Sequence, residues 1–232
     1  MGAIGFELPE DVRSVREGVI AFVRREVLPR QEKHHELLSD GRRLYGENGA
    51  YAPEVVELIR EVRMLSAEAG FYAMCAPASI GGGGLGHLAY YASWEAIYHL
   101  CGGHSVLAPW VIAHWAFGPS PVLTQVSDRA RQEILDGMVS GAKSMCFGLS
   151  EPGAGSDATM IKTRASRTNA GWRISGRKLW TTNAPTADWC IVFAVTDPEK
   201  AARKAGGISG FLVPTSAKGF TVESVVRLYG HV

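Results

Sequence analysis

Two short segments of the chain combine hydroxyl side chains and glycines in a pattern that could hold a planar aromatic cofactor together with its phosphates. The first spans 145–157 and has the sequence MCFGLSEPGAGSD, and the second spans 178–183 and has the sequence KLWTTN. In the first segment a strand-like run leads into a tight glycine-rich turn, whose backbone N–H groups and serine hydroxyls can donate hydrogen bonds to phosphate oxygens. In the second, a tryptophan and two threonines offer an aromatic face and further donors.

The glycines of the first segment also fit the G-x-G-x-x-A pattern of a dinucleotide-binding fold, from Gly153 to Ala158. That fold needs a helix directly after the glycines and an acidic residue about 20 residues later to hold a ribose. Between Ala158 and Ala187 there is neither aspartate nor glutamate, and no apolar helical stripe follows the glycines. The Asn-Ala-Gly run at 169–171 predicts a hairpin turn instead. We therefore expect phosphates to bind a loop between strands.

Together the two segments resemble the two flavin signatures of the acyl-CoA dehydrogenase family. LSEPGAGSD at 149–157 is similar to the first signature, and KLWTTN at 178–183 is similar to the second, at a matching separation. The glycine-rich run PASIGGGGLG at 77–86 and the stretch at 209–220 resemble further parts of that family. The resemblance covers most of the chain. It implies an FAD-dependent enzyme that oxidises the Cα–Cβ bond of an acyl-CoA thioester, with hydride passing to the flavin.

The resemblance also implies roles for individual residues. Those that would contact the FAD are Phe147, Leu149, Ser150, Gly155, Ser156, Trp180, Thr181 and Thr182. Ser156 would also contact the acyl-CoA, and the Thr182 hydroxyl would lie near the nitrogen that accepts the hydride. Hydroxyls and backbone N–H groups suit such contacts because they donate hydrogen bonds without adding a competing charge. Phe147 and Ser150 stand where the family more often has tyrosine and threonine.

Each of these residues also has a purely structural interpretation. Trp180 could be core filler of a strand, and Ser150 and Ser156 could cap a turn. Glu151 and Asp157 flank the turn, and a carboxylate beside phosphates would be repelled, so we interpret both as turn or salt-bridge residues rather than acid–base catalysts. The seven histidines are scattered without the spacing of metal ligands, and no metal site is predicted.

Composition and charge exclude several other classes of protein. The 24 lysines and arginines nearly balance the 23 aspartates and glutamates, without a basic block, so no nucleic-acid partner is expected. The four cysteines lie far apart among apolar neighbours, which predicts buried free thiols and a reducing compartment such as the cytoplasm. Prolines interrupt the apolar run at 105–123, so we expect a buried helix at 110–117 and no membrane span.

The elements that must position the two segments follow from the hydrophobic pattern. Apolar residues recur at three- and four-residue steps from Val12 to Val27, Pro29 interrupts the pattern, and 31–38 could resume it. A loop is expected at 39–52. Further helices are predicted at 53–70, 88–100 and 128–138, the last with Ser127 as its N-cap. This pattern predicts an all-helical N-terminal domain over 1–141.

Beyond residue 141 the period of the pattern shifts towards two, which predicts an antiparallel β-domain over 142–232 that contains the flavin segments. The predicted strands span 143–150, 162–167, 171–175, 189–196, 208–214 and 220–226. The expected fold class is therefore α+β, with a helical domain followed by an antiparallel β-domain, as in a truncated acyl-CoA dehydrogenase.

The catalytic base cannot be assigned within this sequence. The family places the glutamate that removes the α-proton in a C-terminal helical domain, and the chain ends at Val232 before that region. One hypothesis is that the chain is part of an oligomeric acyl-CoA dehydrogenase that passes electrons to a carrier such as an electron-transferring flavoprotein, and that it is inactive alone. The alternative is a non-catalytic flavin- or acyl-CoA-binding subunit, or a truncated paralogue, that acts with a partner chain.

Overall fold

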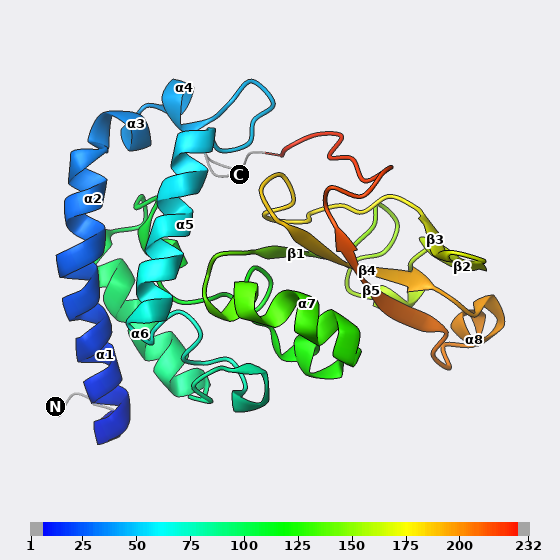
Figure 1. Cartoon of the computed structure of the whole chain (residues 1–232), viewed down its shortest axis with the longest axis horizontal. Coiled ribbons are helices and arrows are strands. Elements are labelled where there is room, and N and C mark those ends of the chain that lie inside the picture. Colours follow the sequence, from blue (N-terminus) through cyan, green and yellow to red (C-terminus); the bar gives the residue numbers. More distant parts are fainter. Residues whose placement is uncertain (1–6, 227–232) are drawn as a thin grey trace, which may run out of the picture. The chain divides into compact units, whose positions relative to one another are not determined.

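The computed structural model describes residues 7–226 and divides the chain into two compact units (Figure 1). The first unit comprises Met1–Gly46 and Tyr51–Lys143 and is helical. The second comprises Glu47–Ala50 and Ser144–Val232 and contains the β-sheet. Both flavin-like segments of the sequence belong to the second unit, so the site can be described within that unit alone.

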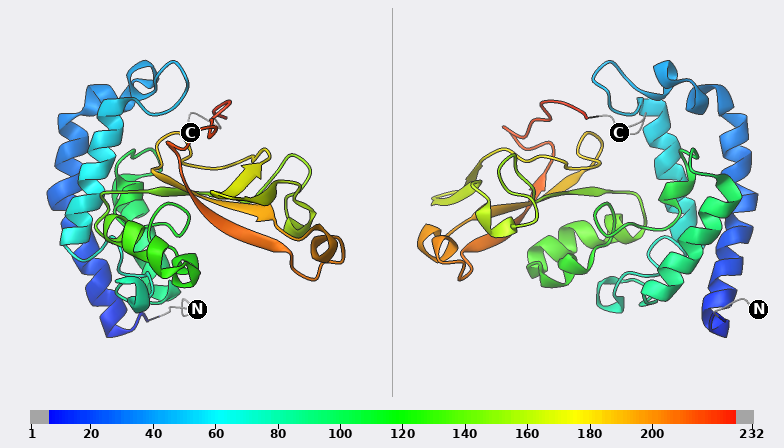
Figure 2. Two further views of the ribbon diagram at one scale, coloured as in Figure 1. Left: turned by 45° about the vertical axis from the view of Figure 1, so that its right-hand side comes forward. Right: turned by 180° about the vertical axis from the view of Figure 1, so that it is seen from behind.

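The helical unit begins with three segments that follow one another without a break: α1 (Glu10–Phe22), the π-helical η1 (Val23–Val27) and α2 (Leu28–Lys33). The N–H of Leu28 bonds the Val23 carbonyl five residues back, and this wide turn directly precedes Pro29, whose ring excludes the ordinary bond to the residue four positions back. The predicted interruption at Pro29 is therefore a π-helical turn within a continuing helix. Figure 2 shows these segments beside α5 (Pro53–Glu68) and α6 (His87–Cys101).

The predicted helices near 53–70, 88–100 and 128–138 are confirmed as α5, α6 and α7 (Asp128–Val139). The Ser127 hydroxyl accepts a hydrogen bond from the Ala130 N–H, which confirms the predicted N-cap. The predicted loop at 39–52 is only partly correct, because α4 (Gly41–Leu44) lies within it, after α3 (His35–Ser39). Short 3-10 turns complete the unit at η2 (Ala78–Ile80), η3 (Ala108–Trp110) and η4 (Pro121–Gln125).

The predicted buried helix at 110–117 is wrong. Only the turn η3 is helical there, and the backbone N–H of Ala113 donates to the Tyr72 carbonyl at 2.8 Å instead of to a carbonyl one helical turn earlier. The segment is nevertheless packed into the core, where Val111 and Ile112 are buried against residues of α1 and α5. No helix within residues 7–226 is long and apolar enough to cross a membrane.

Within the residues that the structure describes, the β-unit is built on a mixed five-stranded sheet around β4 (Trp189–Val195). One edge of β4 pairs along its whole length with β5 (Ile208–Pro214) in antiparallel register. Its other edge pairs in parallel with β1 (Met145–Gly148), and β2 (Arg164–Thr168) begins beside Val195. β2 and β3 (Gly171–Ser175) form the predicted hairpin. The short helix α8 (Pro198–Ala202) connects β4 to β5.

The prediction of an α+β fold is confirmed, but the sheet is mixed rather than wholly antiparallel. Some 40 residues separate β1 from β4, which is long enough for the crossover that a parallel pair requires. The predicted strand at 220–226 is wrong, because no strand forms among these described residues. Val222 and Val226 are exposed there, and the N–H of Phe220 instead closes a turn onto Ala217.

Candidate functional site

The two flavin-like segments lie side by side in the β-unit. The N–H of Leu179 donates to the Ser150 carbonyl at 2.9 Å, and the side-chain amide of Asn183 donates to the Met145 carbonyl at 3.0 Å. Asn183 at the end of the second segment thus lies beside Met145 at the start of the first. The segment 178–183 therefore runs antiparallel to β1 and the residues that follow it. The structure thus brings together the two motifs that the sequence separates by 20 residues.

The glycine-rich turn of the first segment begins directly after β1. Glu151 and Ala154 exchange two backbone hydrogen bonds, of 2.9 and 3.1 Å, which close a tight turn over Pro152 and Gly153. Gly155 and Ser156 follow in exposed positions, and a Cβ placed on Gly155 would meet no atom within 4 Å. The protein itself therefore leaves open space beside this backbone, and a need for glycine at this position would come from a ligand.

The second segment carries Trp180 in an unusual backbone conformation. Trp180 has φ of 59°, in the left-handed region that bulky residues rarely adopt, and Asn183 has φ of 70°. The Trp180 side chain is 61% exposed, so the interpretation of this residue as core filler is wrong. A strained backbone that presents a large aromatic ring to solvent is typical of ligand-binding positions.

Thr181 and Thr182 follow Trp180 and differ in their surroundings. Thr182 is exposed, whereas the Thr181 hydroxyl oxygen is buried and has no hydrogen-bond partner. A buried hydroxyl without a partner is costly, because the group loses its hydrogen bonds to water. The Thr181 hydroxyl is thus a polar group for which the described part of the chain itself supplies no partner.

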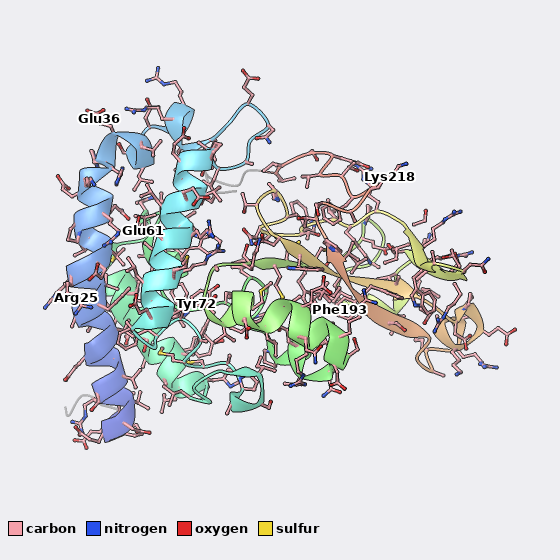
Figure 3. All side chains as sticks on the ribbon, in the orientation of Figure 1. Arg25, Glu36, Glu61, Tyr72, Phe193 and Lys218 are labelled. Atoms are coloured by element: carbon pink, nitrogen blue, oxygen red, sulfur yellow. The ribbon has the colours of Figure 1, made fainter. Side chains whose placement is uncertain are left out.

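Phe147, Leu149 and Ser150 occupy the end of β1 and the residues just after it, and all three are half-buried. The Phe147 ring packs on Phe193 of β4, which Figure 3 labels, with the two ring centroids 5.0 Å apart. Phe147 is therefore part of the packing between β1 and β4. Any ligand contact by Phe147 has to be made by the part of the ring that this packing leaves accessible.

The two carboxylates that flank the turn are both ion-paired, which confirms their interpretation as salt-bridge residues. Burial raises the pKa of Glu151, but hydrogen bonds from Lys178, Thr163 and the backbone outweigh it and hold the pKa at about 2. A hydrogen bond from Lys204, 2.7 Å away, lowers the pKa of Asp157 to about 2, with help from Thr159. Both groups are thus anions at neutral pH and poor acceptors for a proton.

Lys178 is a site residue to which the sequence analysis gave no role. Its Nζ lies 2.8 Å from Glu151 and 3.1 Å from the Leu149 carbonyl, so it joins the two segments. The sequence contains one signal for this residue, because the acidic Glu151 lies in the first motif and the basic Lys178 lies in the second. In the part of the chain that the structure describes, no group of three or more histidines, cysteines, aspartates or glutamates could hold a metal ion.

Comparisons with known proteins agree with this geometry. The sequence matches the acyl-CoA dehydrogenase N-terminal domain over residues 9–142 and the acyl-CoA dehydrogenase middle domain over residues 146–231. The chain therefore belongs to the acyl-CoA dehydrogenase family.

Among its relatives, the mitochondrial short-chain specific acyl-CoA dehydrogenase of Sus scrofa is 32% identical over 219 residues, which are 93% of this chain and 46% of the relative. A crystal structure of glutaryl-CoA dehydrogenase from Mycobacterium smegmatis superposes with a TM-score of 0.65 at 30% identity, and covers 92% of this chain and 48% of that one. A glutaryl-CoA dehydrogenase from the same organism in complex with FADH2 superposes with a TM-score of 0.66 at 27% identity, and covers 95% of this chain and 49% of that one. The chain thus spans about half the length of the proteins it matches.

Proposed function

We propose that this chain is the flavin-binding part of an acyl-CoA dehydrogenase, which oxidises the Cα–Cβ bond of an acyl-CoA thioester. The observation that carries the proposal is the juxtaposition of the glycine-rich turn with Trp180 and Thr181, in a chain that belongs to this family. An exposed indole and a buried hydroxyl without a partner fit a flat, hydrogen-bonding ring such as that of FAD. When bound, FAD supplies the acceptor for the hydride that leaves the substrate.

The residues of this chain divide the binding of FAD between them. Phe147, Leu149 and Ser150 would line one edge of the ring, and all three are half-buried. Gly155 and Ser156 offer an open, exposed backbone to the pyrophosphate, and Ser156 also contacts the acyl-CoA. Trp180, Thr181 and Thr182 would bind the opposite side of the ring.

The two carboxylates beside the proposed flavin site do not serve as the base that removes the α-proton. Glu151 and Asp157 are the carboxylates that flank the glycine-rich turn, and each is engaged by a lysine with its pKa held at about 2. A general base at neutral pH needs a pKa much closer to 7. We therefore infer that the chain alone binds the cofactor without completing the reaction.

The remaining expectations extend the same proposal. The helical part over 1–141 and the β-part over 142–232 act as separate domains of a cytoplasmic oligomer. A protein carrier such as an electron-transferring flavoprotein would accept the electrons taken from the substrate.

The experiment that tests the proposal is an absorbance spectrum of the chain with FAD, before and after addition of a panel of acyl-CoA thioesters. With this chain we expect a perturbed flavin spectrum that the thioesters do not bleach. With a longer enzyme that includes the chain, we expect the thioesters to bleach the flavin. Flavin that remains spectrally free in both proteins would contradict the proposal. A perturbed flavin that no acyl-CoA reduces, even in the longer protein, would favour the non-catalytic binding subunit.

A further inference from the structure

The side chain of Lys178 spans the first flavin segment from Gly148 to Glu151. A Cβ added to Gly148 would lie 3.4 Å from Cγ of Lys178, so the lysine stem packs directly on this glycine. Beyond the stem, Nζ donates to the Leu149 carbonyl at 3.1 Å and to Glu151 at 2.8 Å. The Lys178 side chain is 12% exposed and that of Glu151 is 7% exposed, so this ion pair is buried.

The carboxylate of Glu151 extends the network to a third segment, at the approach to β2. One oxygen accepts a hydrogen bond from the Lys162 N–H at 2.6 Å, and the other accepts from the N–H and the hydroxyl of Thr163, at 2.9 and 2.5 Å. Thr163 in turn lies against Gly176, where an added Cβ would collide with the Thr163 hydroxyl. The carboxylate thus holds both flavin segments against the start of the hairpin.

A buried ion pair contributes little net stability compared with a well-packed apolar pair, because both charges must be removed from water. The pair does fix the local geometry, because each hydrogen bond of the network sets the distance between two particular segments. The nearby core consists of apolar residues of β1 and β4 and the segment before β4, so the pair is not part of its apolar packing.

We propose that the Lys178–Glu151 ion pair is a positioning device that sets the separation of the two FAD-binding loops. Lys178 acts through the Leu149 carbonyl that it binds, beside the backbone hydrogen bond from Leu179 to Ser150, and neither Lys178 nor Glu151 is itself a ligand of the flavin. The inference rests on the proposed function for its effect on FAD, whereas its effect on the loops can be measured without any ligand.

A second ion pair in the same unit provides a matched control. Lys204 lies 2.7 Å from Asp157, the last residue of the first segment, but both side chains are at least half exposed. An exposed pair of this kind fixes geometry weakly, because solvent and salt screen it and neither side chain is held by packing. Removal of its positive charge should leave the loops where they are.

The test compares Lys178→Met, which keeps the stem and removes the charge, with Lys204→Met. Backbone hydrogen exchange reports on the Leu179 N–H, which bonds Ser150, and on the amides that pair β4 with β5. Fluorescence titration gives the dissociation constant of FAD. For Lys178→Met we expect the acceleration of exchange at Leu179 to exceed that across β4 and β5 about tenfold, and FAD to bind about tenfold more weakly. Lys204→Met should match the original chain in exchange at Leu179 and across β4 and β5.

A second variant, Glu151→Gln, keeps the shape of the side chain and the acceptor for Thr163, and covers the case that Lys178→Met does not fold. Lys178→Arg restores the charge and should recover most of the protection at Leu179. Unchanged exchange at Leu179 in a folded Lys178→Met or Glu151→Gln would overturn the proposal. Equal acceleration at Leu179 and across β4 and β5 would also overturn it, because the pair would then support the whole unit. If the original chain binds no FAD, the proposed function fails. The exchange data alone then decide whether the ion pair positions the two loops.

Discussion

The backbone N–H of Leu179 lies 2.9 Å from the carbonyl oxygen of Ser150, and this hydrogen bond joins two loops that the sequence separates by 28 residues. It sets the hydroxyl-bearing turn after β1 beside the segment that carries Trp180. Because the two loops run antiparallel, ring-binding and phosphate-binding groups come to adjacent positions. The candidate site exists because these two loops are fixed to each other.

Thr181→Val should have opposite effects on the stability of the chain and on its affinity for FAD. Valine has nearly the same shape and removes a buried hydroxyl that has no partner, so the free energy of unfolding should stay equal or rise by about 1 kcal/mol. If the hydroxyl bonds the flavin, the dissociation constant of FAD should rise about tenfold. Urea unfolding and fluorescence titration measure the two quantities, and Thr181→Ser is the matched control. A variant that loses stability but keeps its FAD affinity would contradict this role.

Trp180→Ala should weaken FAD binding without destabilising the chain. The indole is 61% exposed, so its loss should change the free energy of unfolding by no more than about 0.5 kcal/mol. Loss of the aromatic contact should weaken FAD binding about tenfold. Trp172, another exposed tryptophan of the same unit, provides the control, since Trp172→Ala should leave the affinity unchanged. Equal FAD affinities for Trp180→Ala and Trp172→Ala would show that Trp180 is not part of the FAD site.

Thr182→Val should slow flavin reduction more than it weakens FAD binding, when it is measured in a chain extended to the full length of the matched relatives. A donor near the hydride-accepting nitrogen matters most as charge develops on the ring, and its loss should slow the step on the order of a hundredfold. Stopped-flow absorbance with a saturating acyl-CoA measures the rate. Reduction at the original rate would show that the Thr182 hydroxyl does not serve this nitrogen.

The stability of the chain should depend on pH through Glu151. Its pKa is lowered from 4.5 to about 2 in the folded chain, so its contribution is fully present above pH 4.5 and is lost as the pH falls towards 2. The shift corresponds to roughly 3 kcal/mol. The difference in unfolding free energy between the original chain and Glu151→Gln should therefore shrink between pH 4.5 and 2. A difference that stays constant across this range would mean that the folded state does not depress this pKa.

Part of this fold and site could be predicted from the sequence because the signals are local. The periodic helices α5, α6 and α7 and the hairpin of β2 and β3 follow from apolar spacing and turn residues within short windows. The glycine-rich turn and the Trp-Thr-Thr run are likewise contiguous motifs. The interpretation of Glu151 and Asp157 as salt-bridge residues needed only the charge of a carboxylate.

The remaining features depend on partners that are distant in the sequence. The apolar run at 110–117 has helical composition, but the Tyr72 carbonyl takes the Ala113 N–H and the helix does not form. The alternating run at 220–226 lacks a strand partner among the described residues. The left-handed backbone of Trp180 and the unpartnered hydroxyl of Thr181 also have no signature in residue type. Both depend on how the second loop lies beside β1.

The most direct test of the account is a titration of the chain with FAD, monitored by quenching of flavin fluorescence and repeated with the double variant Trp180→Ala/Thr181→Val. The account predicts saturable binding of one FAD per chain, weakened at least about tenfold in the double variant while circular dichroism shows both proteins equally folded. Binding that does not saturate, or an identical dissociation constant for the two proteins, would contradict the claim that these two loops form a flavin site.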